Sequence, residues 1–164
     1  MDFQETGVAA LCTSEALLLA DDMGLGKTVQ AAVALARLRT QGLIASALVV
    51  APVGLLAQWR RMLKQWAPKL SVATIRGGPA DRAWQWRRSA DVFLAGYETV
   101  RGDLTSHPEC PLNRDWDVVV LDEAQRIKNR WTDTAQQCKR LPRRRAWALT
   151  GTPLENAIAD LASI

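Results

Sequence analysis

Short apolar runs alternate with helix-like stretches along the whole chain, and this alternation limits the fold more than any other feature. The runs hold four or five apolar residues without polar alternation, which is typical of strands covered on both faces. They lie at residues 16–20, 47–51, 72–75, 92–95 and 118–121, with a weaker sixth at 146–149. Stretches of helical composition lie between them at residues 28–38, 55–66, 81–89 and 132–141. We therefore predict an α/β fold with a mainly parallel sheet, helices on both faces and right-handed crossovers.

The 164 residues amount to one domain, 1–164, and a composition of 48% hydrophobic and 23% charged residues excludes a disordered chain. Cys12, Cys110 and Cys138 lie far apart and the chain has one histidine, which argues against a disulfide framework and a zinc site. These features favour a reducing cytoplasm. The longest apolar run, at residues 47–57, is shorter than the ~20 residues of a membrane helix, so we expect no membrane partner.

Charge and tryptophan content point to a polyanionic partner without identifying one. Residues 1–57 carry five acidic and three basic side chains, whereas residues 58–164 carry twelve acidic and eighteen basic ones. Such a basic half is compatible with nucleic acid, and equally with an ordinary solvated surface. Several of the seven tryptophans lie among arginines and lysines, where they could stack on bases. Trp59 and Trp66 are seven residues apart, however, and this spacing also predicts one buried helix face.

A phosphate-binding loop is predicted where the first apolar run meets the first helical stretch. The sequence there reads Asp-Asp-Met-Gly-Leu-Gly-Lys-Thr over residues 21–28. Gly24 and Gly26 allow backbone N–H groups to turn around a polyphosphate at a helix N-terminus. Lys27 could reach the β and γ phosphates and the Thr28 hydroxyl could bind Mg²⁺. The strict P-loop pattern asks for glycine at position 21, where this chain has Asp21.

A pair of acids ends the most apolar run, where the sequence reads Asp-Glu-Ala-Gln over residues 122–125. Open α/β sheets bind ligands at the carboxyl ends of their strands, so both side chains would face a bound nucleotide. We assign Asp122 to Mg²⁺, directly or through water, and Glu123 to the orientation and deprotonation of the attacking water. An Asp-Glu pair alone would more simply cap a helix. Its occurrence together with Gly-Lys-Thr favours the catalytic interpretation.

The chain resembles the first RecA-like lobe of the SWI/SNF-type DNA-translocating ATPases of helicase superfamily two. Six segments carry the resemblance, in the order of that family: residues 3–11, 19–28, 50–59, 96–99, 122–129 and 149–156. The last reads Leu-Thr-Gly-Thr-Pro-Leu-Glu-Asn and is far more specific than Gly-Lys-Thr. It also differs from the Ser-Ala-Thr of DEAD-box RNA helicases. The Asp-Glu-Ala-Gln form is common in bacterial members, so the resemblance implies a bacterial, nucleoid-associated protein of the cytoplasm.

The resemblance implies ATP and Mg²⁺ as cofactors and extends the set of site residues. Gln4 would contact the adenine, and residues 22–28 would form the nucleotide loop. The residues implied for nucleotide binding are Gln4, Asp22, Met23, Gly24, Leu25, Gly26, Lys27 and Thr28. Gln125 joins Glu123 and Lys27 in the implied catalytic set. DNA contacts are implied near residues 52–58, 97–101 and 150–152, although the family usually has threonine where this chain has Gly96.

The implied partners are double-stranded DNA, held non-specifically through its backbone, and a second RecA-like lobe that supplies arginine fingers. We expect that lobe to lie outside residues 1–164, because the chain starts and stops within helical patterns. The residues 143–145, all arginine, are expected to form a surface run rather than a finger. Two alternatives stay open. One is a binding module that holds nucleotide or a partner without hydrolysis, and the other is the motor lobe of a restriction or polymerase-recycling enzyme, with RNA polymerase or another DNA-bound protein as partner.

Overall fold

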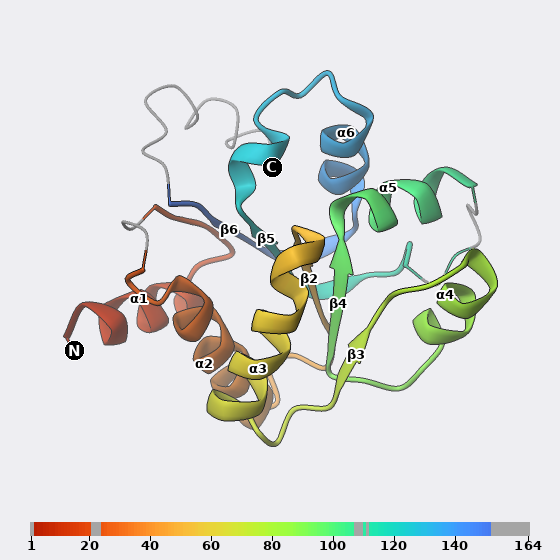
Figure 1. Cartoon of the computed structure of the whole chain (residues 1–164). Helices are drawn as coiled ribbons and strands as arrows, with labels where there is room; N and C mark the ends of the chain where they lie inside the picture. The colour runs from red at the N-terminus through yellow and green to blue at the C-terminus, as the bar shows by residue number, and fades with distance from the viewer. Residues whose placement is uncertain (1, 21–23, 107–109, 111, 152–164) are drawn as a thin grey trace.

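Six parallel strands form a single sheet in the order β1-β6-β5-β2-β4-β3 (Figure 1). The structure is a computed structural model, and it describes residues 2–20, 24–106, 110 and 112–151. The strands are β1 (Ala16–Leu19), β2 (Ala47–Ala51), β3 (Val72–Thr74), β4 (Val92–Gly96), β5 (Trp116–Asp122) and β6 (Arg143–Leu149). Every neighbouring pair runs parallel. The predicted α/β class and all six predicted strands are confirmed.

Helices cover both faces of this sheet, as the unbroken apolar runs predicted (Figure 1). The helices are α1 (Asp2–Thr13), α2 (Lys27–Thr40), α3 (Leu56–Trp66), α4 (Pro79–Trp86), α5 (Tyr97–Ser106) and α6 (Asp133–Arg140), with 3₁₀ turns η1 (Val53–Leu55) and η2 (Ala124–Ile127). Within β2, Val49 packs with α1, α2 and α3, whereas Leu48 and Val50 pack with α4, α5 and α6. Successive strand residues point to opposite faces, so each strand contributes to two apolar layers.

The Gly-, Pro- and Asp-rich composition of residues 102–115 predicts a long loop, and helix α5 corrects that prediction. Gly102 suggested a loop, but the helix continues to Ser106 because its inner face is held by tertiary contacts. Asp103 is buried and accepts hydrogen bonds from Arg82 Nη2 at 2.7 Å and Trp86 Nε1 at 2.8 Å. These bonds fix α5 against α4. The remaining part of the predicted loop includes His107, which lies outside the described residues.

The arginines at 143–145 form the predicted surface run only in part, because Arg144 is exposed whereas Arg143 and Arg145 are partly buried. They form the first part of β6, and Arg143 Nη1 donates to the carbonyl oxygens of Lys139 at 3.0 Å and Leu141 at 2.7 Å. These carbonyls belong to the end of α6, where a helix leaves backbone acceptors without partners of its own. Arg143 therefore satisfies a helix terminus. Arg144 is exposed and lies 3.5 Å from a carboxylate oxygen of Asp117.

The tryptophans divide between core and surface, so the prediction of one buried face carrying both Trp59 and Trp66 is half right. Trp59 is fully buried, whereas Trp66, at the end of the same helix, is 48% exposed. Trp86 stacks on Phe93 with ring centroids 5.9 Å apart, inside the layer under α4. Trp84 is exposed and lies under the Arg88 guanidinium. Across the described residues, no helix is both long and apolar enough to cross a lipid bilayer.

Candidate functional site

Residues 24–26, directly before α2, have a backbone conformation that suits a phosphate-binding loop. Gly24 and Gly26 have φ values of 87° and 79°, a region that side-chain-bearing residues rarely adopt. Gly26 is the N-cap of α2, so the N–H groups of the first helical turn, which begins at Lys27, are not bonded within the helix and point toward the loop. Thr28 lies in the same turn. The predicted loop–helix junction is thus present, while Asp22 and Met23 lie outside the described residues.

Helix α1 brings Gln4 to this loop. The Gln4 side-chain amide donates a hydrogen bond to the Leu25 carbonyl oxygen at 3.3 Å. A Cβ atom at position 26 would lie 2.8 Å from Gln4 Nε2, so glycine is needed there for the amide to approach. Gln4 and Leu25, which are 21 positions apart in the sequence, are therefore adjacent in the structure. The assignment of both residues to one nucleotide site requires this.

Asp122 ends β5 at the same edge of the sheet as the loop, and its carboxylate is held on both oxygens. The indole Nε1 of Trp59 donates to Oδ2 at 2.7 Å, and the backbone N–H of Glu123 donates to Oδ1 at 3.0 Å. Burial raises the pKa of Asp122, the Trp59 bond opposes that rise, and the nearby positive charge of Lys27 also lowers the pKa. Lys27 and Asp122 therefore lie within electrostatic reach of each other.

Glu123 has a left-handed backbone, with φ 53° and ψ 50°, and is the one residue other than glycine with positive φ in the described part of the chain. Such a conformation is unfavourable for a side-chain-bearing residue and occurs often at functional sites. It turns the chain sharply at the end of β5. The Gln125 amide donates a hydrogen bond to Glu123 Oε2, so Glu123 and Gln125, both predicted as catalytic, are in contact.

Two further contacts, which the sequence did not predict, tie this turn to its neighbours. The Thr150 hydroxyl, at the end of β6, donates to Gln125 Oε1 at 2.9 Å. The Tyr97 hydroxyl, at the start of α5, donates to the Asp122 backbone carbonyl at 2.7 Å. The resemblance placed both residues in functional segments, but no spacing pattern indicated which atoms they would contact.

The donor set fits Mg²⁺ in the manner of a nucleotide site. In the part of the chain that the structure describes, no three His, Cys, Asp or Glu side chains cluster as a metal cage would require. Mg²⁺ in nucleotide sites usually takes one or two protein oxygens, with the remaining positions filled by phosphate and water. Asp122 has acceptor capacity beyond its two hydrogen bonds, because a carboxylate has about four lone-pair sites. The fit therefore requires no more protein ligands than the two predicted from the sequence, Asp122 and the Thr28 hydroxyl.

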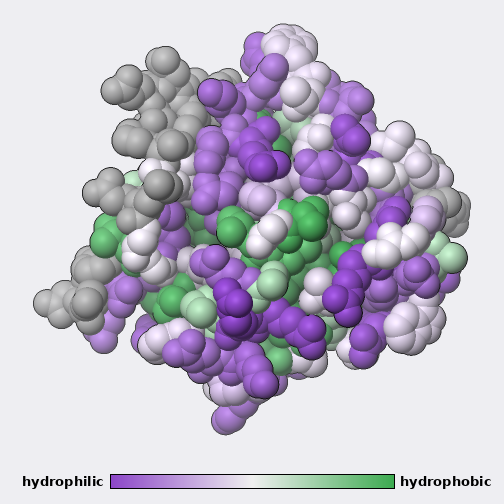
Figure 2. Space-filling view, in the orientation of Figure 1, coloured by the Kyte–Doolittle hydropathy of each residue, from purple (hydrophilic) through white to green (hydrophobic). Residues whose placement is uncertain are grey.

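The segments expected to contact DNA follow β2, β4 and β6, so they share the sheet edge that carries Asp122. Val53, which follows β2, and Gly96, which ends β4, lie in close contact. A Cβ atom at position 96 would lie 2.7 Å from Val53 Cγ2, which explains why this chain has glycine there. The face of the molecule in Figure 2 combines a central apolar area with surrounding hydrophilic surface.

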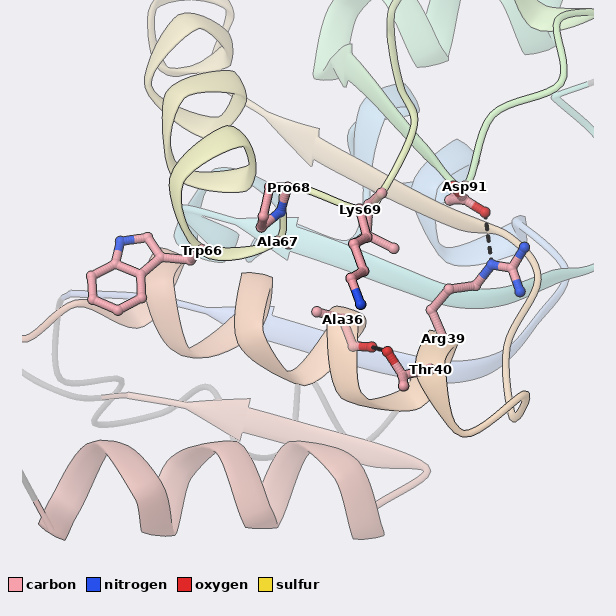
Figure 3. Close-up of a pocket in the computed structure, with 9 residues that line it drawn as sticks. Ala36, Arg39, Thr40, Trp66, Ala67, Pro68, Lys69 and Asp91 are labelled. Atoms are coloured by element: carbon pink, nitrogen blue, oxygen red, sulfur yellow. Dashed lines mark hydrogen bonds and ion pairs between the residues drawn. The ribbon is translucent and has the colours of Figure 1, made fainter.

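A separate cleft of about 290 Å³ lies at the opposite edge of the sheet, between the ends of α2 and α3 (Figure 3). Trp66 and Lys69 line it, and Arg39 Nε contacts Asp91 Oδ1 at 2.7 Å on its far side. None of the predicted nucleotide or metal residues line this cleft. The predicted nucleotide and metal residues therefore lie at the other edge of the sheet. A phosphate-binding loop there is open to solvent and does not need an enclosed cavity.

Comparison with known proteins gives one consistent result. The family described as SNF2-related domain matches residues 3–164. "Helicase ssl-1" of Caenorhabditis elegans is 34% identical over 153 residues, which cover 90% of this chain and 6% of that protein. "ISWI chromatin-remodeling complex ATPase ISW1" of Saccharomyces cerevisiae is 32% identical over 151 residues, covering 88% of this chain and 13% of the relative. The chain thus spans a small part of the curated relatives it matches.

A solved structure has the same fold over nearly the whole chain. The Sulfolobus solfataricus SWI2/SNF2 ATPase core in complex with dsDNA superposes with a TM-score of 0.84 at 32% sequence identity. The match covers 98% of this chain and 34% of the solved one. The parallel sheet with helices on both faces is therefore the RecA-like fold of that core.

Proposed function

Because the chain belongs to the SNF2-related family, we propose that it is the ATP-binding lobe of a protein that hydrolyses ATP to move along double-stranded DNA. The observation that carries the proposal is the arrangement at one sheet edge. The loop before α2, Asp122 and Glu123 occupy the carboxyl ends of β1 and β5, and Lys27 influences the pKa of Asp122. Phosphate-loop ATPases need this combination of groups.

In this proposal each residue has a separate task. Backbone N–H groups of residues 24–28 bind the phosphates, and Lys27 offsets the charge of the β and γ phosphates. Thr28 and Asp122 hold Mg²⁺, which when bound neutralises charge that develops on the phosphoryl oxygens. Glu123 orients the attacking water and accepts its proton, and Gln125 holds the Glu123 carboxylate. Gln4 contacts the adenine from α1.

The DNA surface is proposed for residues 52–58, 97–101 and 150–152, of which position 152 lies outside the described residues. These segments follow strand ends beside the nucleotide loop, so one closing movement could involve both ligands. A second RecA-like lobe would complete the cleft. The structural relative described above was solved with dsDNA, which supports a duplex as the ligand.

We propose the bacterial cytoplasm, close to the nucleoid, as the location. Cys12, Cys110 and Cys138 are unpaired thiols, and Cys138 is buried with its pKa raised by that burial to about 12. A buried thiol with so high a pKa is a poor nucleophile and packs as a small apolar group. This cysteine usage fits a reducing compartment.

Nucleotide binding tests the proposal directly. Isothermal titration of Mg·ATP and Mg·ADP into the chain should give binding that Lys27→Ala weakens at least about tenfold, a loss of about 1.4 kcal/mol. Lys69→Ala is the matched control, because Lys69 is an exposed lysine in the cleft at the opposite edge. Equal affinities for the wild type and Lys27→Ala would overturn the site assignment.

A further inference from the structure

The contact between Trp59 and Asp122 joins two distant parts of the chain inside the core. Trp59 lies in the first turns of α3, is fully buried, and places its indole Nε1 2.7 Å from Asp122 Oδ2. An indole nitrogen can only donate, and most buried donors are paired with an acceptor. Because the ring is fixed by its packing, the N–H is aimed at one point in space.

This bond controls the rotation of the carboxylate. Oδ1 of Asp122 accepts from the Glu123 backbone and Oδ2 from Trp59, so the two oxygens are held from different directions. The acceptor capacity that remains on each oxygen then faces a defined direction. Groups that bond to a metal ligand in this way orient it and tune its affinity for the metal.

The helix that carries Trp59 begins directly after the segment proposed to bind DNA. Residues 52–58 include η1 and the start of α3, and Trp59 is the next residue. A second proposed DNA segment contacts the same acid, since the Tyr97 hydroxyl donates to the Asp122 carbonyl at 2.7 Å. Helices α3 and α5, which follow the neighbouring strands β2 and β4, therefore each donate a hydrogen bond to Asp122 from an aromatic side chain.

We propose that Trp59 is a positioning residue, which sets the orientation of the Asp122 carboxylate toward Mg²⁺ and links movement of residues 52–58 to the metal site. This inference rests on the proposed function. A displacement of α3 moves the indole N–H and so changes the geometry offered to the metal. By reciprocity, a metal that holds Asp122 favours one position of α3.

A purely structural tryptophan would behave differently, and the chain contains one for comparison. Trp147 is also fully buried in the same apolar layer, but its Nε1 has no hydrogen-bond partner among the described residues. Trp147→Phe therefore removes a similar volume from the same core without removing a bond to Asp122. Trp59→Phe removes both.

The first measurement is a titration of Mg²⁺ into the chain saturated with ADP, read by calorimetry, beside ADP binding in the presence of a chelator. For Trp59→Phe we expect Mg²⁺ affinity to fall about tenfold, the lower end of the effect of such contacts. ADP affinity without Mg²⁺ should stay within about twofold. Trp147→Phe should change neither. Equal Mg²⁺ affinity in Trp59→Phe and the wild type overturns the inference, as does equal loss in both variants.

A second measurement needs no substitution, so it holds if Trp59→Phe does not fold. The chain is labelled with ¹⁵N-tryptophan, and its indole resonances are assigned by through-bond NMR experiments. In the ADP-bound chain, the Trp59 indole N–H resonance should shift when Mg²⁺ is added. The exposed Trp131 should not respond. If Mg·ADP binds but the Trp59 resonance does not shift, the inference about Trp59 is overturned and the proposed function is not. A wild-type chain that binds no nucleotide overturns the proposed function as well.

Discussion

The Thr150 hydroxyl donates a hydrogen bond to Gln125 Oε1 at 2.9 Å, and the Gln125 amide in turn donates to Glu123. The end of β6 is thereby connected to the proposed general base through one side chain. Thr150 is almost fully buried, so its hydroxyl has little access to water. The orientation of Glu123 consequently depends on where β6 ends.

Replacing Thr150 by valine keeps the shape and removes the donor. We expect the free energy of unfolding to fall by about 1–2 kcal/mol, because Gln125 Oε1 is left without this partner. ATP turnover of the two-lobed protein should fall about tenfold or more while nucleotide affinity stays within about twofold, because Glu123 loses its support and the phosphate loop does not. Phosphate release and calorimetry measure the two effects.

Thr105→Val is the control for that substitution. The Thr105 hydroxyl donates to the Arg101 carbonyl within α5, at an exposed position. Its loss should leave turnover unchanged. Turnover that falls equally in both variants, or in neither, would contradict a role for Thr150 in holding Glu123.

A polypeptide of these 164 residues, assayed alone, should hydrolyse ATP very slowly. The resemblance assigns the arginine finger to a second lobe, and Arg143 is engaged with the carbonyls that end α6. An arginine finger typically contributes 10³–10⁵-fold, about 4–7 kcal/mol of barrier. Glu123→Gln should therefore change the slow turnover of this polypeptide little, yet abolish turnover of the two-lobed protein.

Steady-state phosphate release with and without duplex DNA checks this expectation. Fast, DNA-stimulated turnover by the 164-residue polypeptide that Glu123→Gln eliminates would show that one lobe is catalytically complete. The account of the second lobe would then be wrong. Such a result would also separate the chain from a binding module that holds nucleotide without hydrolysis.

Duplex binding should be weak and electrostatic. With about two to four phosphate contacts, the logarithm of the binding constant should fall with the logarithm of salt concentration at a slope of about −2 to −4. Arg101→Ala, at an exposed residue of a proposed DNA segment, should reduce that slope by about one. Arg88→Ala should not, since Arg88 lies over Trp84 beyond α4. Fluorescence anisotropy over a salt series gives these values, and tight, sequence-selective, salt-insensitive binding would contradict them.

Acid should destabilise the fold at the sheet edge opposite the nucleotide site, where the Asp91 carboxylate accepts hydrogen bonds from Arg39 and Ser71. Burial alone would raise the pKa of Asp91, but hydrogen bonds from Ser71 at 2.6 Å and Arg39 at 2.7 Å outweigh it and hold the pKa below its usual value. A lowered folded-state pKa stabilises the fold above the unfolded pKa, about 3.9, and this contribution is lost as pH falls through the folded value. Asp91→Asn should cost about 1–3 kcal/mol at pH 7 and progressively less below about pH 4.

Urea unfolding across this pH range measures the effect. Asp115→Asn, at an exposed acid, is the control and should change stability little at any pH. A destabilisation by Asp91→Asn that stayed constant down to pH 3 would mean that packing, rather than the charge of Asp91, holds Ser71 and Arg39 together.

The sequence predicted the strands because both faces of the sheet are buried, so most of each strand is an apolar run; in β6 this run begins only after three arginines. It did not predict α5 beyond Gly102, since that helix depends on Asp103 meeting Arg82 and Trp86. At the site, residue types and their order indicated Lys27 and Asp122. The bond from Trp59 to Asp122 joins residues 63 positions apart, and no local pattern carries such a contact.

The sheet order also has a consequence for how the protein is made. β1, which leads into the phosphate loop, pairs with β6 among the described strands, with Ala16 opposite Ala146 and Leu19 opposite Leu149. Of the described strands, β1 is synthesised first and β6 last, so β1 cannot pair with β6 until the residues between them have been made, and closing so long a loop is slow. A nascent chain that has completed every nucleotide-contacting residue still lacks the neighbour that holds its loop in place. The ability to bind ATP should thus appear abruptly, once synthesis has passed β6.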